Sequence, residues 1–98
     1  MHIISADMID HALDPVTLAD ALADGFRSDI ILPLRHHHEI DRSPQNATLL
    51  LMPAWTGKSA IPAYLGTKIV TIFSGNGALN LPSVYGTYLL LEIGRAHV

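Results

Sequence analysis

The sequence contains no cysteine, which excludes disulfide bonds, a thiolate nucleophile and a zinc site with cysteine ligands. Charge is also scarce: 15% of the residues are charged, and the formal net charge is -3 at pH 7. The few basic residues form no stripe that would favour a phosphate backbone or an anionic membrane surface. We therefore expect neither a nucleic-acid partner nor a membrane partner.

Long hydrophobic runs are missing as well. The longest run, Leu49–Trp55, is far shorter than the roughly 18 residues of a membrane-spanning helix. The first residues lack the basic stretch followed by an apolar stretch that is typical of a secretory signal. These features predict a cytoplasmic protein.

Hydrophobic residues are nevertheless abundant, at 49% of the 98 residues. A chain of this length buries only roughly 60 to 70% of the surface that its unfolded form exposes. The hydrophobic content exceeds what a lone domain of this size needs for its core. We expect marginal stability and a missing partner surface.

Helix signals lie near the amino terminus. Ser5 is a suitable cap for a short helix over residues 6–13, and Asp14 with Pro15 is typical of the start of a second helix. Apolar residues then recur at three- and four-residue spacing, namely Leu18, Ala19, Leu22, Ala23 and Phe26. This pattern predicts one buried stripe on a docking helix.

Strand patterns fill the rest of the chain. An extended segment over 29–38 is interrupted at Pro33, and strands are predicted at 48–52 (ended by Pro53 and buried on both faces), at 64–73 and at 84–91. Polar loops at 41–46 and 57–62 separate them. The expected fold is α+β, with two amino-terminal helices packed against a mixed or antiparallel sheet of about four strands.

Lys68 shares a strand face with Val70 and Ile72. A lysine among buried aliphatic side chains must find an anion or lose its charge. The alternative is an edge-strand lysine whose ammonium group reaches water.

The run Arg35-His36-His37-His38-Glu39 has two possible uses. Successive strand residues point to opposite faces, so the three histidines cannot converge on one metal ion, and we expect no metal site. The guanidinium of Arg35 presents a planar fork that matches a carboxylate, although a plain surface arginine is the alternative.

Two further features are weaker. Ser74-Gly75-Asn76-Gly77 lacks the spacing of a dinucleotide or phosphate loop and predicts a tight turn. Met52, beside Pro53, could line a pocket, and ordinary core packing is the alternative.

Four motifs in order resemble one family. They are Arg35–Glu39 (RHHHE), Leu49–Trp55 (LLLMPAW), Leu65–Phe73 (LGTKIVTIF), and Asn76 with Leu81–Val84 (LPSV). Their order and spacing are similar to those of the ornithine cyclodeaminase / mu-crystallin family, and the first two are most similar to its delta-1-pyrroline-2-carboxylate reductase branch. The resemblance covers about Ile3 to Glu92.

The resemblance implies the amino-terminal part of a two-domain, NAD(P)H-dependent oxidoreductase that reduces a small cyclic imino acid. Residues 1–92 would be part of the substrate-binding and dimerisation domain, pairing with a second copy through the sheet. Arg35 and Lys68 would bind the substrate carboxylate, Met52 would line the pocket, and Lys68 would be the catalytic residue. The family's Rossmann domain, which holds the cofactor, is absent, so we expect this chain to bind no cofactor and to be inactive alone.

Residues 93–98 (IGRAHV) do not match the family and resemble translated sequencing adapter, hence the hypothesis of a read-through artefact. Ornithine cyclodeamination and alanine-type dehydrogenation remain alternative activities for the parent enzyme. A different alternative is a non-catalytic module that binds small carboxylates or dimerises. Such a module should cover its apolar surface, whereas a fragment should leave it exposed.

Overall fold

The computed structural model describes residues 1–94, so most of the predicted tail over 93–98 lies outside the described residues. The fold is α+β, as predicted. Helices α1 (Ala6–Ala12) and α2 (Pro15–Arg27) come first in the chain, and the strands that follow form one antiparallel sheet of five strands. No helix in the described part of the chain is long and apolar enough to cross a membrane.

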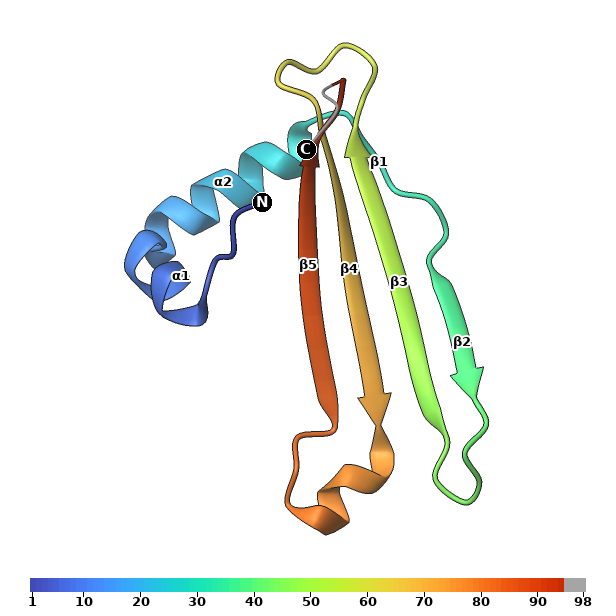
Figure 1. The fold of residues 1–98 in the computed structure, drawn as a ribbon. Helices are drawn as coiled ribbons and strands as arrows, with labels where there is room; N and C mark the ends of the chain where they lie inside the picture. The colour runs from blue at the N-terminus through green and yellow to red at the C-terminus, as the bar shows by residue number, and fades with distance from the viewer. Residues whose placement is uncertain (95–98) are drawn as a thin grey trace.

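The sheet is built on two long central strands (Figure 1). The elements are β1 (Ile30–Ile31), β2 (His36–Ile40), β3 (Ala47–Thr56), β4 (Tyr64–Phe73), the 3-10 helix η1 (Ser74–Leu79) and β5 (Val84–Glu92). The strand order is β1-β3-β4-β5, and β2 also pairs with β3. Predicted strands 64–73 and 84–91 are confirmed to within one residue.

Both helices begin where their capping residues predicted. The Ser5 hydroxyl accepts a hydrogen bond from the Met8 N–H at 3.3 Å. The Asp14 carboxylate accepts from the N–H groups of Val16 and Thr17, each at 3.0 Å, and Pro15 opens the helix. These bonds satisfy donors that a helix leaves free in its first turn.

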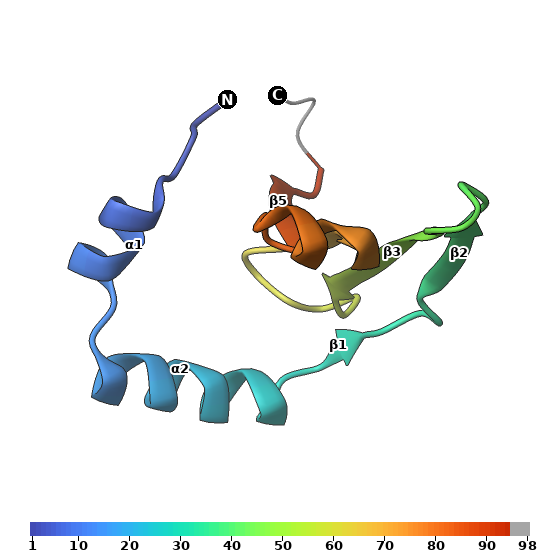
Figure 2. The ribbon, with the colours of Figure 1, turned by 90° about the horizontal axis from the view of Figure 1, so that it is seen from below.

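The apolar stripe of α2, expected to be buried, is exposed in this chain. Leu18 is 39% exposed, Leu22 53% and Phe26 90%. Figures 1 and 2 show the reason: α1 and α2 form an arm that runs away from the sheet instead of lying across it. The periodicity was sufficient to predict the helix. Within residues 1–94, however, no surface covers its apolar stripe.

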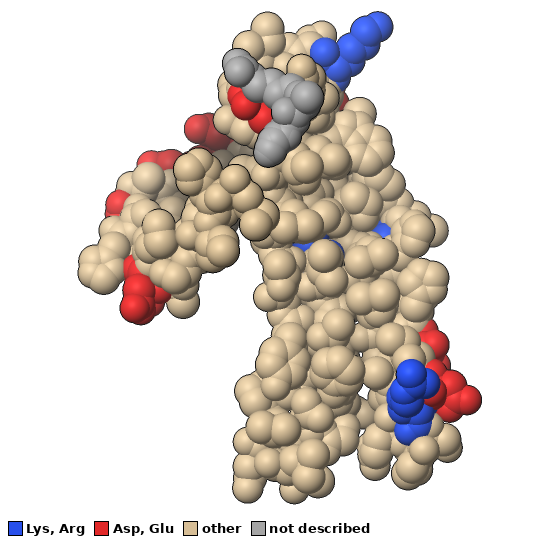
Figure 3. All heavy atoms as spheres, in the orientation of Figure 1, with Lys and Arg blue, Asp and Glu red and all other residues tan. Residues whose placement is uncertain are grey.

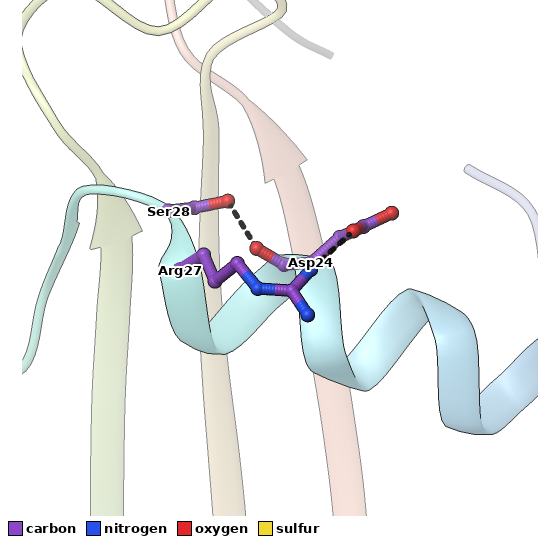
Figure 4. Close-up of polar contacts among 3 residues, drawn as sticks. All are labelled: Asp24, Arg27 and Ser28. Atoms are coloured by element: carbon purple, nitrogen blue, oxygen red, sulfur yellow. Dashed lines mark hydrogen bonds and ion pairs between the residues drawn. The ribbon is translucent and has the colours of Figure 1, made fainter.

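The polar contacts of α2 are local and solvent-exposed. Near its carboxyl end, Arg27 pairs with the Asp24 carboxylate at 3.2 Å, and the Ser28 hydroxyl donates to the Asp24 carbonyl at 2.8 Å (Figure 4). Both partners of the ion pair are highly exposed. Such an exposed pair adds little to stability. Both of its residues are on α2, so the pair makes no link between the helix and the sheet.

Strands β1 and β2 form one interrupted edge along β3. Ile31 pairs with Trp55, and His36 pairs with Leu51. The edge therefore advances five residues, from 31 to 36, while β3 advances only four, from 51 to 55. The extra residue makes a bulge in the segment that contains Pro33, which lacks an N–H for the ladder. The predicted proline-marked irregularity is confirmed here.

The prediction that Pro53 ends its strand, however, is wrong. β3 continues to Thr56, with Pro53 opposite Thr67. The physical reason is the bulge: between Leu51 and Trp55, β3 has ladder partners in β4 alone. Pro53 therefore lies where β3 behaves as an edge strand, the one setting in which a sheet tolerates proline.

Little of the chain forms a core. The apolar residues classed as buried are Ala47 and Val70, so the predicted burial of residues 48–52 on both faces is wrong, and they are half-buried. The accessible surface is 8205 Å² for a mass of 10.6 kDa. A compact monomer of this mass exposes about 5,500 Å². The structure is therefore an open sheet with an uncovered arm.

The uncovered surface is mostly apolar. One side of the molecule appears in Figure 3 as a nearly uncharged expanse, with charged atoms gathered on the helical arm and at the two ends of the sheet. The radius of gyration is 16.7 Å, compared with roughly 13 Å for a compact domain of this length. An exposed apolar area of this extent is typical of a surface that is covered in a larger assembly.

Candidate functional site

The register of the sheet brings two of the predicted site residues together. Met52 lies directly opposite Lys68, and Lys68 lies directly opposite Tyr88. Directly opposed residues of antiparallel strands point to the same face. The three side chains thus form one row across β3, β4 and β5, which we call the Lys68 row.

Lys68 lies on β4, between β3 and β5. The edge placement in the alternative reading is therefore wrong, whereas its expectation that the lysine reaches water agrees with the exposure of Lys68. Its neighbours on the same face of β4, Val70 and Ile72, are apolar, as predicted. Lys68 itself is exposed, because within residues 1–94 nothing covers this face, and no ion pair joins it to a carboxylate of those residues. The ammonium group is available to an anionic ligand.

Arg35 lies at the end of the bulge, one residue before β2, and is exposed. Arg35 immediately precedes His36, and His36 pairs with Leu51, the residue before Met52 in β3. The backbone of Arg35 is therefore near Met52 in the sheet, and its side chain is exposed. Arg35 and Lys68 thus approach Met52 from the β2 side and the β4 side of β3.

The three histidines separate as the alternation predicts. His36 and His38 share a face, with ring centroids 5.7 Å apart, whereas His37 lies between them and pairs with Leu50. Among residues 1–94, no three histidine or acidic side chains are grouped in a way that could hold a metal ion.

A hollow of about 120 Å³ adjoins the Lys68 row. We call it the Gly66 hollow; its lining includes Ile30, Ala54, Tyr64, Gly66, Tyr88 and Leu90. Ala54 and Gly66 are opposite one another in the ladder, so the β3 and β4 positions of this row have small side chains, whereas the β5 position is Leu90. The hydroxyl of Tyr88 lies over Gly66 so closely that a Cβ at residue 66 would meet it.

A larger hollow of about 350 Å³ lies at the other end of the sheet and contains none of the predicted site residues. Two of its polar side chains, Arg42 and Asn76, donate to backbone carbonyls. The Arg42 guanidinium donates to the Asp41 carbonyl at 2.9 Å, and the Asn76 amide donates to the Pro82 carbonyl at 3.0 Å. We therefore place the candidate site at the Lys68 row.

Residues Ser74–Gly77, predicted as a tight turn, begin the 3-10 helix η1, which continues to Leu79. Asn80 ends it in the left-handed conformation, at φ 56°. A dinucleotide phosphate requires a glycine-rich loop followed by a longer helix whose first N–H groups face the ligand. The segment does not fit that group.

Sequence reasoning missed Tyr88 and Gly66. Tyr88 is an ordinary strand residue in the sequence. Gly66 lies in the Leu65–Phe73 motif, and a glycine inside a strand can mark a close approach of another group, but this signal was not used. What makes them site residues is the register, which sets Tyr88 beside Lys68 and leans its ring over Gly66. A prediction of the β4–β5 register would have been the required signal.

Comparison with known proteins gives partial matches. No protein-family profile matches the sequence. The chain is 43% identical over 65 residues to Protein SAR DEFICIENT 4 of Arabidopsis thaliana, across 66% of this chain and 19% of that protein. It is 35% identical over 94 residues to an uncharacterized protein of Schizosaccharomyces pombe, across 91% of this chain and 27% of that protein. The chain thus spans about a fifth to a quarter of the length of these relatives.

Proposed function

We propose that this chain is the substrate-binding part of an NAD(P)H-dependent reductase of cyclic imino acids, of the delta-1-pyrroline-2-carboxylate type, in the ornithine cyclodeaminase / mu-crystallin family. One observation supports the proposal: Lys68 lies opposite Met52 on a strand face whose other residues are apolar, and Arg35 comes directly before the strand that pairs with the residue next to Met52. Two cations beside an apolar surface are suited to a small apolar molecule with one carboxylate.

The chemistry of the chain's own residues is binding and orientation. The Arg35 guanidinium would grip the carboxylate with its planar fork, and the Lys68 ammonium would neutralise the same charge from the other side. Met52 would contact the adjoining apolar part of the substrate. Fixing the carboxylate at two points also fixes the imine carbon relative to the sheet, which removes rotational freedom before reaction. When bound to the longer parent enzyme, NAD(P)H would supply the hydride.

The proposal includes pairing with a second copy through the sheet. The exposed surface of one chain exceeds that of a compact monomer by about 2,700 Å². Two copies together would have an excess of about 5,400 Å², near the upper end of the total area that obligate homodimers bury. Among the described residues no strand pairs with the outer edge of β5, whose nine residues contain no proline and carry a single charge at Glu92. Such an edge favours pairing with another strand.

The proposal also includes a cytoplasmic location for the parent enzyme.

The uncovered apolar area also separates the proposed function from its alternative. A self-contained carboxylate-binding module should bury most of its apolar side chains. Here Phe26 is 90% exposed and Leu34 is 92% exposed, although both are large and hydrophobic. This exposure supports part of a larger enzyme over a stand-alone module.

A binding and activity measurement tests the proposal. The chain, labelled with 15N, would be titrated with delta-1-pyrroline-2-carboxylate while the amide signals around residue 68 are followed, and NADPH absorbance would be recorded in parallel. We expect binding without NADPH consumption. Lys68→Met should weaken binding by about ten-fold, the effect of losing one charge-assisted hydrogen bond.

Lys58→Met is the matched control, because Lys58 is also an exposed lysine but lies in the loop after β3. It should bind the imino acid as the unmodified chain does. Equal weakening by both variants would mean that net charge, and not the Lys68 row, attracts the ligand. Absence of binding to the unmodified chain would refute the proposed function.

A further inference from the structure

We infer that the Gly66 hollow is the subsite for the apolar ring of a small cyclic carboxylate, with Gly66 and Tyr88 as its specificity-determining residues. The inference rests on the proposed function, because it takes the carboxylate to be held by Arg35 and Lys68. The inference assigns a binding place to the ring of the ligand, which the two cations do not contact in the proposed function.

The floor of the hollow is made by two small residues. Gly66 has no side chain, and its ladder partner Ala54 has a single methyl group. Leu90, opposite Gly66 on β5, is the large side chain of this row. The adjacent row on the same face contains Met52, Lys68 and Tyr88, which are long. An apolar group attached to the bound carboxylate would lie over the lower part of the floor, at Ala54 and Gly66.

The walls are apolar and aromatic. Tyr64 and Tyr88 contribute rings, and Ile30 and Leu90 contribute aliphatic groups. Tyr88 is 62% exposed, and its ring leans toward Gly66, so it bounds the hollow on the side of the Lys68 row. Its hydroxyl lies at the floor, over Gly66, where the backbone can be approached closely because no Cβ intervenes.

The dimensions suit a small ring. Gly66 and Lys68 are two residues apart on the same face of β4, which separates their Cα atoms by about 7 Å. A five- or six-membered ring bearing one carboxylate bridges that distance once the lysine side chain leans toward the ligand. The volume of about 120 Å³ is several times the roughly 30 Å³ that one water occupies in the liquid. A long chain or a fused ring system would extend beyond it.

The test compares two carboxylates that differ only in the ring. Acetate and cyclopentanecarboxylate would be titrated into the 15N-labelled chain, and both dissociation constants would be obtained from the amide shifts of residues 66 and 68. We expect cyclopentanecarboxylate to bind about ten-fold more tightly, the effect of burying about two methylene groups.

Gly66→Ala places a methyl group on the floor, where it displaces the Tyr88 hydroxyl. The exposed Tyr88 side chain can swing outward, so the sheet should remain folded, which the dispersion of the amide spectrum would confirm. We expect the variant to lose the ten-fold ring preference and to bind acetate as before. Gly86→Ala is the control: Gly86 lies on the same face of β5 with nothing within 4 Å of the added Cβ, and the preference should persist.

Each outcome separates the subsite from the proposed function. If acetate binding depends on Lys68 but the ring brings no gain, or if Gly66→Ala leaves the gain intact, the subsite is refuted and the cationic anchor stands. If the ring compound binds at the hollow with equal strength after Lys68→Met, the hollow stands as an apolar site and the proposed anchor fails. If neither compound binds, both fail.

Discussion

The helical arm and the centre of the sheet contain the same kinds of apolar residues, yet they differ in how those residues are used. Helix α2 has a capping aspartate, proline at its first position and a regular apolar stripe, but none of its residues is buried. Strand β4 has no comparable start signal, and its Val70 is 7% exposed. Local signals are therefore enough to form an element, whereas burial requires neighbours on both sides. β4 has two such neighbours, β3 and β5, whereas no helix or strand of residues 1–94 packs extensively against α2.

The largest expected contrast between the two regions is in amide hydrogen exchange. A helix of 13 residues without tertiary cover is marginal in water, whereas a central strand opens only when the sheet does. We expect the amides of Tyr64–Phe73 to exchange on the order of a hundred-fold more slowly than those of Pro15–Arg27, after correction for intrinsic rates. Nuclear magnetic resonance of the chain in deuterated buffer measures both. Equal protection in the two regions would mean that the arm is covered in solution, which a dilution series would reveal.

Truncating one apolar side chain in each region gives the next contrast. Val70→Ala should lower the free energy of unfolding by about 2 kcal/mol, because it leaves a cavity at the centre of the sheet. Leu22→Ala removes more atoms, yet we expect a change within about 0.5 kcal/mol, because Leu22 is exposed and alanine is a strong helix former. Urea denaturation followed by tryptophan fluorescence provides both values. A loss at Leu22 as large as that at Val70 would show that the arm is packed.

The smallest expected effect is the pH dependence of the arm. The hydroxyl and N–H of Thr17, with the N–H of Val16, hold the pKa of Asp14 below its ordinary value of 3.8. Because the folded pKa is the lower one, this cap contributes fully above the ordinary value and is lost as the pH falls through the folded pKa. We expect the helical circular dichroism signal to fall below about pH 4.

Asp14→Asn isolates that effect, because asparagine caps a helix about as well as aspartate and does not ionise in this range. The difference in helical signal between the variant and the unmodified chain should therefore widen as the pH falls from 5 to 2. A difference that stays constant over this range would contradict a titrating cap.

Several features followed from the residues alone because they depend on near neighbours. Ser5 and Asp14 mark helix starts through bonds to residues two or three positions away. The alternation in Tyr64–Phe73 correctly placed Lys68 with Val70 and Ile72. Pro33 correctly marked an irregular edge. The prediction that Pro53 ends its strand was wrong, because a proline is tolerated in a strand when no second strand needs its N–H. Whether such a strand is present depends on the distant segment between β1 and β2.

The same distinction applies to the candidate site. Arg35, Met52 and Lys68 were proposed from their residue types and from a family resemblance, and these could not state their spatial relation. Gly66 carried only the general signal of a glycine within a strand, and Tyr88 carried none, because their relation arises from a cross-strand register between positions 20 or more residues apart.

By itself, the sequence determined the helix caps, the strand alternation, the scarcity of charge and an apolar content too large for one small domain. Those are properties of single residues and of neighbours within a few positions, where chain connectivity fixes the geometry. Only the tertiary structure decided that Lys68 lies on an interior strand, that Met52 and Tyr88 flank it, and that Gly66 opens a hollow beside it. These relations depend on which backbone groups of distant strands pair, and a shift of one residue would turn every one of those side chains to the other face.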